Sequence, residues 1–198
     1  LEGQLEVEAS IRSILGNAYL SLAFYDESLA HHERALALYL KLYRPDHPYV
    51  ATCYNNIGAV YNKKGEYDKA LENYQKSLAI SLKTLGSDHP DNGNLGAQAW
   101  GVPKQFMDRT GRVAHNDVAH NYLGIGSAYA RKGEIDKALE YYQKALAIDL
   151  KQLGPDHPHT AMSYLNIGSA YARKGEYDKA LENYQKSLAI TLKQQGPN

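Results

Sequence analysis

An internal repeat constrains this chain more than any other feature of its sequence. The sixteen residues from Gly65 to Ile80 recur without a change from Gly175 to Ile190. The ten residues at 125–134 recur in the same way at 167–176. Self-similarity over a few tens of residues is typical of stacked copies of one supersecondary unit. We therefore expect a regular array of such units.

The spacing of a recurring small residue counts the units. Glycines at equivalent places stand at Gly16, Gly58, Gly126 and Gly168, so the intervals are 42, 68 and 42 residues. The Asp-His-Pro element around His47, His89 and His157 keeps these intervals and places an extra 26 residues after Pro90. We therefore expect two units at 1–91, an irregular, glycine-containing insertion at 92–117 in the third unit, and the last two units at 118–198.

Each unit contains two stretches with the periodicity of an amphipathic helix. In the second unit, Tyr54, Ile57 and Tyr61 stand at i, i+3 and i+7, and a similar pattern resumes after Gly65. Glycine after a basic helix end favours a left-handed C-terminal cap, and Pro after Asp-His favours a new helix start. Each unit is therefore expected to be an antiparallel helix pair.

These features resemble the tetratricopeptide repeat (TPR) family. The matching residues in the second unit are Tyr54, Ile57, Gly58, Tyr61, Tyr67, Ala70, Tyr74 and Ser77, and those in the fourth are Tyr164, Ile167, Gly168, Tyr171, Tyr177, Ala180, Tyr184 and Ser187. The period of 42 residues, longer than the family's usual one of about 34, is similar to the repeat of kinesin light chains. The resemblance implies an all-α, right-handed superhelical solenoid of about four TPR units that binds protein partners.

The resemblance also implies where a partner binds, because one stripe of the first helices lines the concave groove in that family. Carried over to this sequence, the stripe has small, amide-bearing and basic residues but no carboxylate. We call the candidate residues the binding stripe; they are Asn17, Asn55, Asn62, Lys63, Leu123, Ser127, Arg131, Leu165, Ser169 and Arg173.

The chemistry of the binding stripe suggests an extended, acidic peptide as its ligand. Asparagine amides can both donate hydrogen bonds to a peptide main chain and accept them from it. Lys63, Arg131 and Arg173 recur at one helical position and would attract carboxylates. The alternative is that these basic side chains only interact with the negative C-terminal ends of their own helices.

Composition excludes several other kinds of partner. The chain has 22 basic and 22 acidic residues, and this zero net charge argues against nucleic-acid binding. Its apolar runs are far shorter than the roughly 20 residues that span a bilayer, so no membrane partner is expected. The single Cys53 excludes an internal disulfide framework and favours a reducing, cytoplasmic setting.

No motif in the sequence predicts catalysis. Phosphate-binding loops, paired zinc histidines and nucleophile elbows are absent, so we expect no enzyme activity, cofactor or metal. His47, His89 and His157 recur with the linker, which favours helix caps or loop hydrogen bonds over metal ligation. Cys53 is expected to be a small buried residue. A rival hypothesis, an enzyme whose site forms between the insertion and the groove, has only the composition of the insertion in its favour.

The insertion has three interpretations. It could be an unstructured loop, since loop closure costs little more as a loop lengthens. Trp100, Phe106 and Met107 could instead serve as anchors that dock the segment as a lid or built-in ligand. Thirdly, it could be a hinge through which two molecules exchange helix pairs.

Self-association is the main alternative function. The last unit has no polar capping helix in this sequence, and an uncovered apolar face favours stacking on another copy. The sequence therefore predicts either a peptide-binding scaffold or a self-assembling repeat module.

Overall fold

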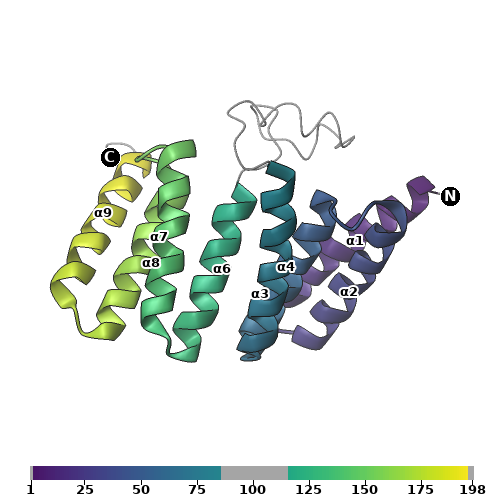
Figure 1. Cartoon of the computed structure of the whole chain (residues 1–198), viewed down its shortest axis with the longest axis horizontal. Coiled ribbons are helices and arrows are strands. Elements are labelled where there is room, and N and C mark those ends of the chain that lie inside the picture. Colours follow the sequence, from purple (N-terminus) through teal and green to yellow (C-terminus); the bar gives the residue numbers. More distant parts are fainter. Residues whose placement is uncertain (1, 86–115, 196–198) are drawn as a thin grey trace. The chain divides into compact units, whose positions relative to one another are not determined.

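The computed structural model describes residues 2–85 and 116–195, and every regular element in these ranges is an α-helix (Figure 1). The chain divides into two compact parts, residues 1–117 and 118–198. From here on we call these parts the first and the second unit, and we call the repeats within them helix pairs. The helices are α1 (Glu2–Ser21), α2 (Tyr25–Leu42), α3 (Pro48–Lys64) and α4 (Tyr67–Leu85), then α6 (Asn116–Lys132), α7 (Ile135–Gln152), α8 (Pro158–Lys174) and α9 (Tyr177–Gln195). The prediction of an all-α fold is confirmed.

A glycine with a positive φ ends the first helix in the later helix pairs. Gly65 ends α3 with a φ of 84°, and its N–H donates to the carbonyl oxygens of Tyr61 and Asn62. Gly175 ends α8 in the same way, with a φ of 83°. Because a positive φ suits glycine and few other residues, the repeated Lys-Gly-Glu sequence stops α3, α6 and α8 at the same place, whereas α1 is followed by Ala23.

Histidine and proline start the first helices of later pairs. His47 precedes α3, and its Nδ1 atom accepts a hydrogen bond from the backbone N–H of Tyr49 at 3.2 Å. His157 caps α8 through the N–H of His159, also at 3.2 Å. The prediction that these two linker histidines act as caps is confirmed, while His89 lies outside the described residues.

The two helices of a pair approach closely where the sequence has its small residue. A β-carbon at Gly58 would lie 2.9 Å from the Tyr74 ring, and one at Gly126 would lie 2.6 Å from the Tyr142 ring. Tyr74 and Tyr142 are accordingly buried. The recurring tyrosine therefore fills the space that the missing side chain leaves.

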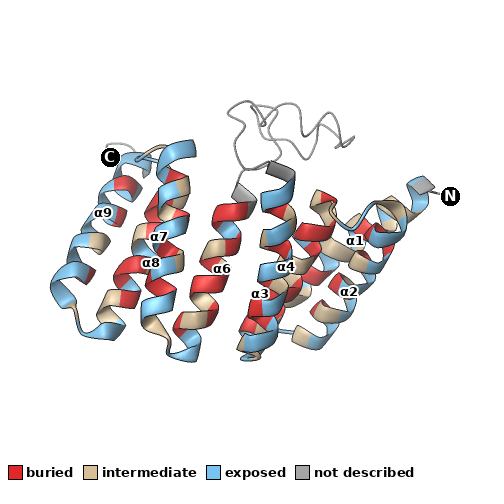
Figure 2. Cartoon of the chain, in the orientation of Figure 1, coloured by how far each residue is buried: buried red, intermediate tan, exposed pale blue. Residues whose placement is uncertain are grey.

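Neighbouring pairs share the core within each unit. In the first unit, Leu38 and Tyr39 of α2 pack with Val50 and Cys53 of α3. In the second, α7 packs against α8, and Figure 2 shows buried residues on the helix faces that meet. Among the described helices, none is long and apolar enough to cross a membrane.

Candidate peptide-binding surface

The first unit carries four residues of the binding stripe. Asn17 and Lys63 are exposed, and Asn55 is half-buried. Asn62 is buried, with only 8% of its surface accessible. Three of the four side chains are therefore accessible to a ligand, whereas Asn62 lies at the edge of the core.

The second unit carries the other six. Arg131, Leu165, Ser169 and Arg173 are exposed, and Ser127 is half-buried. Leu123 is different, because it is only 7% exposed and belongs to the hydrophobic core. The prediction that Leu123 lines a binding surface is therefore wrong.

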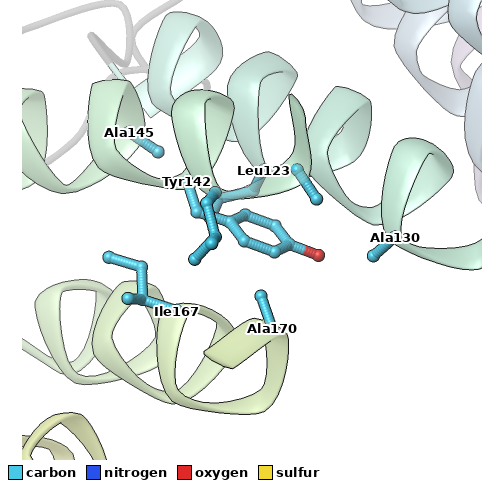
Figure 3. Close-up of a cluster of buried hydrophobic side chains, with 8 residues drawn as sticks. Leu123, Ala130, Tyr142, Ala145, Ile167 and Ala170 are labelled. Atoms are coloured by element: carbon cyan, nitrogen blue, oxygen red, sulfur yellow. The ribbon is translucent and has the colours of Figure 1, made fainter. Parts of the chain in front are cut away.

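Packing between helix pairs explains the burial of Leu123. Its side chain lies in one cluster with Tyr142 of α7 and with Ile167 and Ala170 of α8 (Figure 3). Leu165 occupies the equivalent position 42 residues later and is 48% exposed. The same residue type is thus covered in α6, where it packs with residues of α8, and accessible in α8.

Two arginines of the second unit act on the ionisation of one tyrosine. Burial raises the pKa of Tyr142 to about 12, although the charges of Arg173 and Arg131 and a hydrogen bond with Ser127 act in the opposite direction. Both guanidinium groups are therefore close enough to the phenol to influence its ionisation. Arg131, Arg173, Ser127 and Tyr142 together form a polar, positively charged cluster, which we call the arginine cluster.

Arg173 has a structural bond in addition to its place in this cluster. Its Nη1 atom donates to the backbone carbonyl of Ala130, near the C-terminal end of α6. This contact differs from the helix-end role that the sequence left open for the basic residues, because Arg173 belongs to α8 and the carbonyl to another helix, α6. A guanidinium has five N–H donors, so one bond to a carbonyl leaves others for a ligand.

The hydroxyl groups of two tyrosines of the second unit make hydrogen bonds to serines of the binding stripe. Tyr184 donates to Ser169 at 3.4 Å, and Tyr142 is hydrogen-bonded to Ser127 at the equivalent place. The signal was present in the sequence, because each serine stands 15 residues before its tyrosine. This constant spacing places a hydroxyl pair beside the binding stripe in both pairs of the second unit.

Catalytic and metal chemistry have little support in the described part of the chain. No group of three or more His, Cys, Asp or Glu side chains there could hold a metal ion. Cys53 is buried, as predicted, and burial raises the pKa of its thiol to about 12. A thiol with so high a pKa is a poor nucleophile near neutral pH. The candidate anchors Trp100, Phe106 and Met107 lie outside the described residues.

Comparison with protein families gives one result. The model of the tetratricopeptide repeat matches residues 7–83, 54–95 and 117–193, which together cover most of the chain. No curated protein matches the sequence.

Several solved structures have the same fold. BtubC (BKLC) from P. vanneervenii is 20% identical, with a TM-score of 0.69 over 96% of this chain and 65% of that one. A Rap protein complexed with competence and sporulation factor is 17% identical, with a TM-score of 0.71 over 94% of this chain and 43% of that one. Aspartyl phosphate phosphatase F from Bacillus subtilis is 16% identical, with a TM-score of 0.71 over 96% and 42%. The chain thus spans less than two thirds of each of these proteins, and the likeness concerns the fold alone.

Proposed function

Because the chain belongs to the tetratricopeptide repeat family, we propose that it is a protein-binding scaffold whose binding stripe, without the buried Leu123, holds an extended, acidic peptide segment. Proteins of this family mediate protein–protein interactions. One structure of the same fold contains a protein complexed with competence and sporulation factor, which supports a binding role for such a scaffold. In this proposal the chain catalyses no reaction itself and needs no cofactor or metal.

The arginine cluster is the observation that carries the proposal. Arg131 and Arg173 are both exposed and both influence the Tyr142 phenol, so their charges act on one small region. A carboxylate is the natural ligand for such a region, since guanidinium groups bind it through charge-assisted and often paired hydrogen bonds.

Exposed apolar residues add a second element of recognition. Met162 and Leu165 of α8 are 47% and 48% exposed, and Leu165 precedes Arg173 on the same helix by eight residues. Eight residues of α-helix span about 12 Å, the length of three or four residues of extended peptide. A peptide lying along α8 would therefore carry an apolar residue three or four positions from an acidic one.

Taken by itself, the first unit has side chains suited to binding a peptide main chain. Asn17 is exposed and Asn55 is half-buried, and each amide has both donor and acceptor atoms. An extended peptide has backbone groups that lose water on binding and need such partners. Lys63 would add a positive charge in this unit.

A single charge reversal tests the assignment. Peptides that bind the protein are first selected from a random linear library, and the affinity of the best one is then measured by fluorescence anisotropy. Arg131→Glu is the test variant, because Arg131, unlike Arg173, has no bond to the Ala130 carbonyl. Lys151→Glu is the matched control, since Lys151 is also exposed in the same unit but lies off the binding stripe.

The two variants should behave differently. We expect Arg131→Glu to weaken binding about tenfold or more, because a hydrogen bond to a charged group contributes about 1.5–3 kcal/mol. Lys151→Glu should change the affinity by less than about threefold, the effect of a distant surface charge. Equal affinities for the two variants would show that the peptide binds another face.

Self-association is a second candidate function, and the surface of α9 favours it. Four large side chains of this helix, those of Tyr177, Leu181, Leu188 and Leu192, are each more than half exposed. Contiguous exposed apolar surface often marks an interaction site. The two other roles considered for the insertion, as a lid or as a hinge, concern residues outside the described ranges and stay predictions.

A cytoplasmic setting is the remaining part of the proposal. The one cysteine, Cys53, is free and buried, so the chain needs no oxidising compartment for its stability. The zero net charge gives no support to a polyanionic partner such as nucleic acid.

A further inference from the structure

The exposed apolar surface of α9 is a regular stripe along one face of the helix. Tyr177, Leu181, Leu188 and Leu192 are 72%, 58%, 57% and 56% exposed. Together with the half-buried Tyr184, they stand at i, i+4, i+7, i+11 and i+15. This spacing keeps all five on one side of an α-helix, where they form a surface suited to another helix. Figure 2 shows most of α9 in the colour of exposed residues.

Within the chain, an equivalent stripe on α7 packs against a neighbouring helix. The equivalent residues of α7, which stand 42 positions earlier, are Ile135, Leu139, Tyr142, Leu146 and Leu150. Leu139 and Tyr142 are 6% and 5% exposed, and they share a cluster with Ile167 and Ala170 of α8. The first helix of the following pair thus covers the α7 stripe as far as Leu146, whereas Leu150 at its end is 37% exposed.

The same chain has a first helix, α1, whose face equivalent to the α7-contacting face of α8 is exposed. The residues of α8 that meet α7 include Ser163, Ile167, Ala170 and Lys174. Their equivalents 152 positions earlier are Ile11, Leu15 and Ala18 of α1 and Leu22, which directly follows this helix. Ile11, Leu15 and Leu22 are 52%, 39% and 66% exposed, so this face of α1 is both apolar and accessible.

We propose that α1 of one molecule stacks on the α9 stripe of a second molecule, in the way that α8 covers α7 within the chain. This inference rests on the proposed self-association and specifies its two surfaces. A second copy fits better than an unrelated helix, because it carries the repeat's own covering face in the repeat's own spacing. The contact is heterologous, since each molecule contributes a different surface.

The polar contacts between α7 and α8 would be replaced, where α1 meets α9, by apolar side chains or by hydroxyl groups that already have a hydrogen-bond partner. Lys174 pairs with Asp136 at 2.7 Å, whereas α1 has Leu22 at the place of the lysine. Exposed ion pairs contribute little, so the loss of this one is minor beside the added apolar contact. The position of Asp149 is taken in α9 by Thr191, whose hydroxyl donates to the Ser187 carbonyl at 3.0 Å. Ile11 would therefore cover no hydroxyl that lacks a partner.

Heterologous stacking predicts growth rather than a closed pair. After two molecules have joined, one α1 face and one α9 stripe are still free, so further copies can add. Isologous α1–α1 or α9–α9 pairing would instead stop at a dimer. The concentration dependence of the molecular mass therefore separates these arrangements.

The test uses sedimentation velocity on the full chain and two double variants over a concentration series. Variant one, Leu181→Glu with Leu188→Glu, alters the α9 stripe, and variant two, Ile11→Glu with Leu22→Glu, alters the α1 face. All four positions are more than half exposed, so folding should be unaffected, and circular dichroism checks this. Ala189→Glu is the control, because this exposed residue lies about 100° around α9 from Leu188.

We expect the unaltered chain and Ala189→Glu to gain mass with concentration, and each double variant alone to be a monomer. An equimolar mixture of the two variants should form dimers and nothing larger, because it holds one intact face of each kind. Association of either variant alone, or a monomeric mixture, would overturn the head-to-tail arrangement while leaving self-association standing. A strictly monomeric unaltered chain would overturn both.

Discussion

The imidazole ring of His32 fills the space beside Gly16: a β-carbon at residue 16 would lie 2.6 Å from the ring atoms Cε1 and Nε2. In the other three pairs the equivalent ring belongs to tyrosine, namely Tyr74, Tyr142 and Tyr184. His32 is fully buried, and neither ring nitrogen has a hydrogen-bond partner among the described residues. The first pair thus replaces a phenol with a group that can become charged.

Acid should destabilise the first unit through His32. Burial, and then the charge of His31, lower the pKa of His32 from 6.5 to about 4. Protons therefore bind the unfolded chain more readily, so the contribution of His32 to stability is complete above pH 6.5 and is lost as the pH falls toward 4. The loss amounts to about 3 kcal/mol in the free energy of unfolding, which urea titrations at a series of pH values measure.

The variant His32→Tyr isolates this effect. It restores the tyrosine of the other pairs and should remove that part of the acid sensitivity. His31→Gln is the matched control and should keep most of it, because burial of His32 is the larger cause. If His32→Tyr and the unaltered chain lose the same stability between pH 6.5 and 4, His32 is not the responsible group.

Alanine at Gly126 should destabilise the second unit. Its β-carbon would lie 2.6 Å from the Tyr142 ring and 3.2 Å from the Ala138 carbonyl oxygen. Such overpacking costs about 1–3 kcal/mol, more than the gain of up to about 1 kcal/mol in helix propensity. Gly3→Ala in α1 meets no atom within 4 Å and should be neutral or slightly stabilising in thermal unfolding. Equal effects of the two changes would refute the close approach.

The turn after α1 should be improved by glycine. Ala23 has a φ of 62° and stands where Gly65 ends α3. A left-handed conformation costs an alanine about 1 kcal/mol, so Ala23→Gly should raise the free energy of unfolding by about 0.5–1 kcal/mol. Gly65→Ala should lower it by a similar amount. A change of the same sign in both variants would contradict this account of the turns.

A buried hydrogen bond joins α7 and α8, and its removal should be costly. The Ser163 hydroxyl donates to the Asp149 carboxylate at 2.6 Å, and the two residues are 0% and 1% exposed. Ser163→Ala should cost about 1.5–3 kcal/mol, because the carboxylate loses a buried donor. Ser169→Ala, an exposed serine of the same helix, should stay within about 0.5 kcal/mol in urea titrations.

A second substitution checks the cause. Asp149→Ser places the residue found at the equivalent Ser81 of α4 and removes the carboxylate. In that background Ser163→Ala should cost clearly less than in the unaltered chain. An undiminished cost would mean that Ser163 acts through packing and not through its hydrogen bond.

Local features of the fold could be predicted from the sequence. The helix pairs follow from apolar spacing, and the turns follow from residues such as Gly65 and His47, which act on their immediate neighbours. The position of Tyr74 in the core follows from the same periodicity, and that of Cys53 from the tendency of a free cysteine to be buried. These predictions succeeded because each depends on a few consecutive residues.

The accessibility of the binding stripe could not be predicted in the same way. Leu123 and Leu165 are equivalent in sequence, yet one is buried by α8 and the other is exposed. Periodicity within one helix says which residues share a face, but burial depends on the helix from the next pair. For the same reason the approach of Arg173 to Ala130, 43 residues away, appears only in the folded chain.

The most direct test of peptide binding is a thermodynamic cycle measured by isothermal titration calorimetry. The unaltered chain and Arg131→Glu are each titrated with the selected peptide and with its version in which Asp and Glu become Asn and Gln. We predict that neutralising the peptide weakens binding to the unaltered chain about tenfold or more and changes the affinity of Arg131→Glu far less. The same loss for both proteins would contradict an acidic ligand at the arginine cluster.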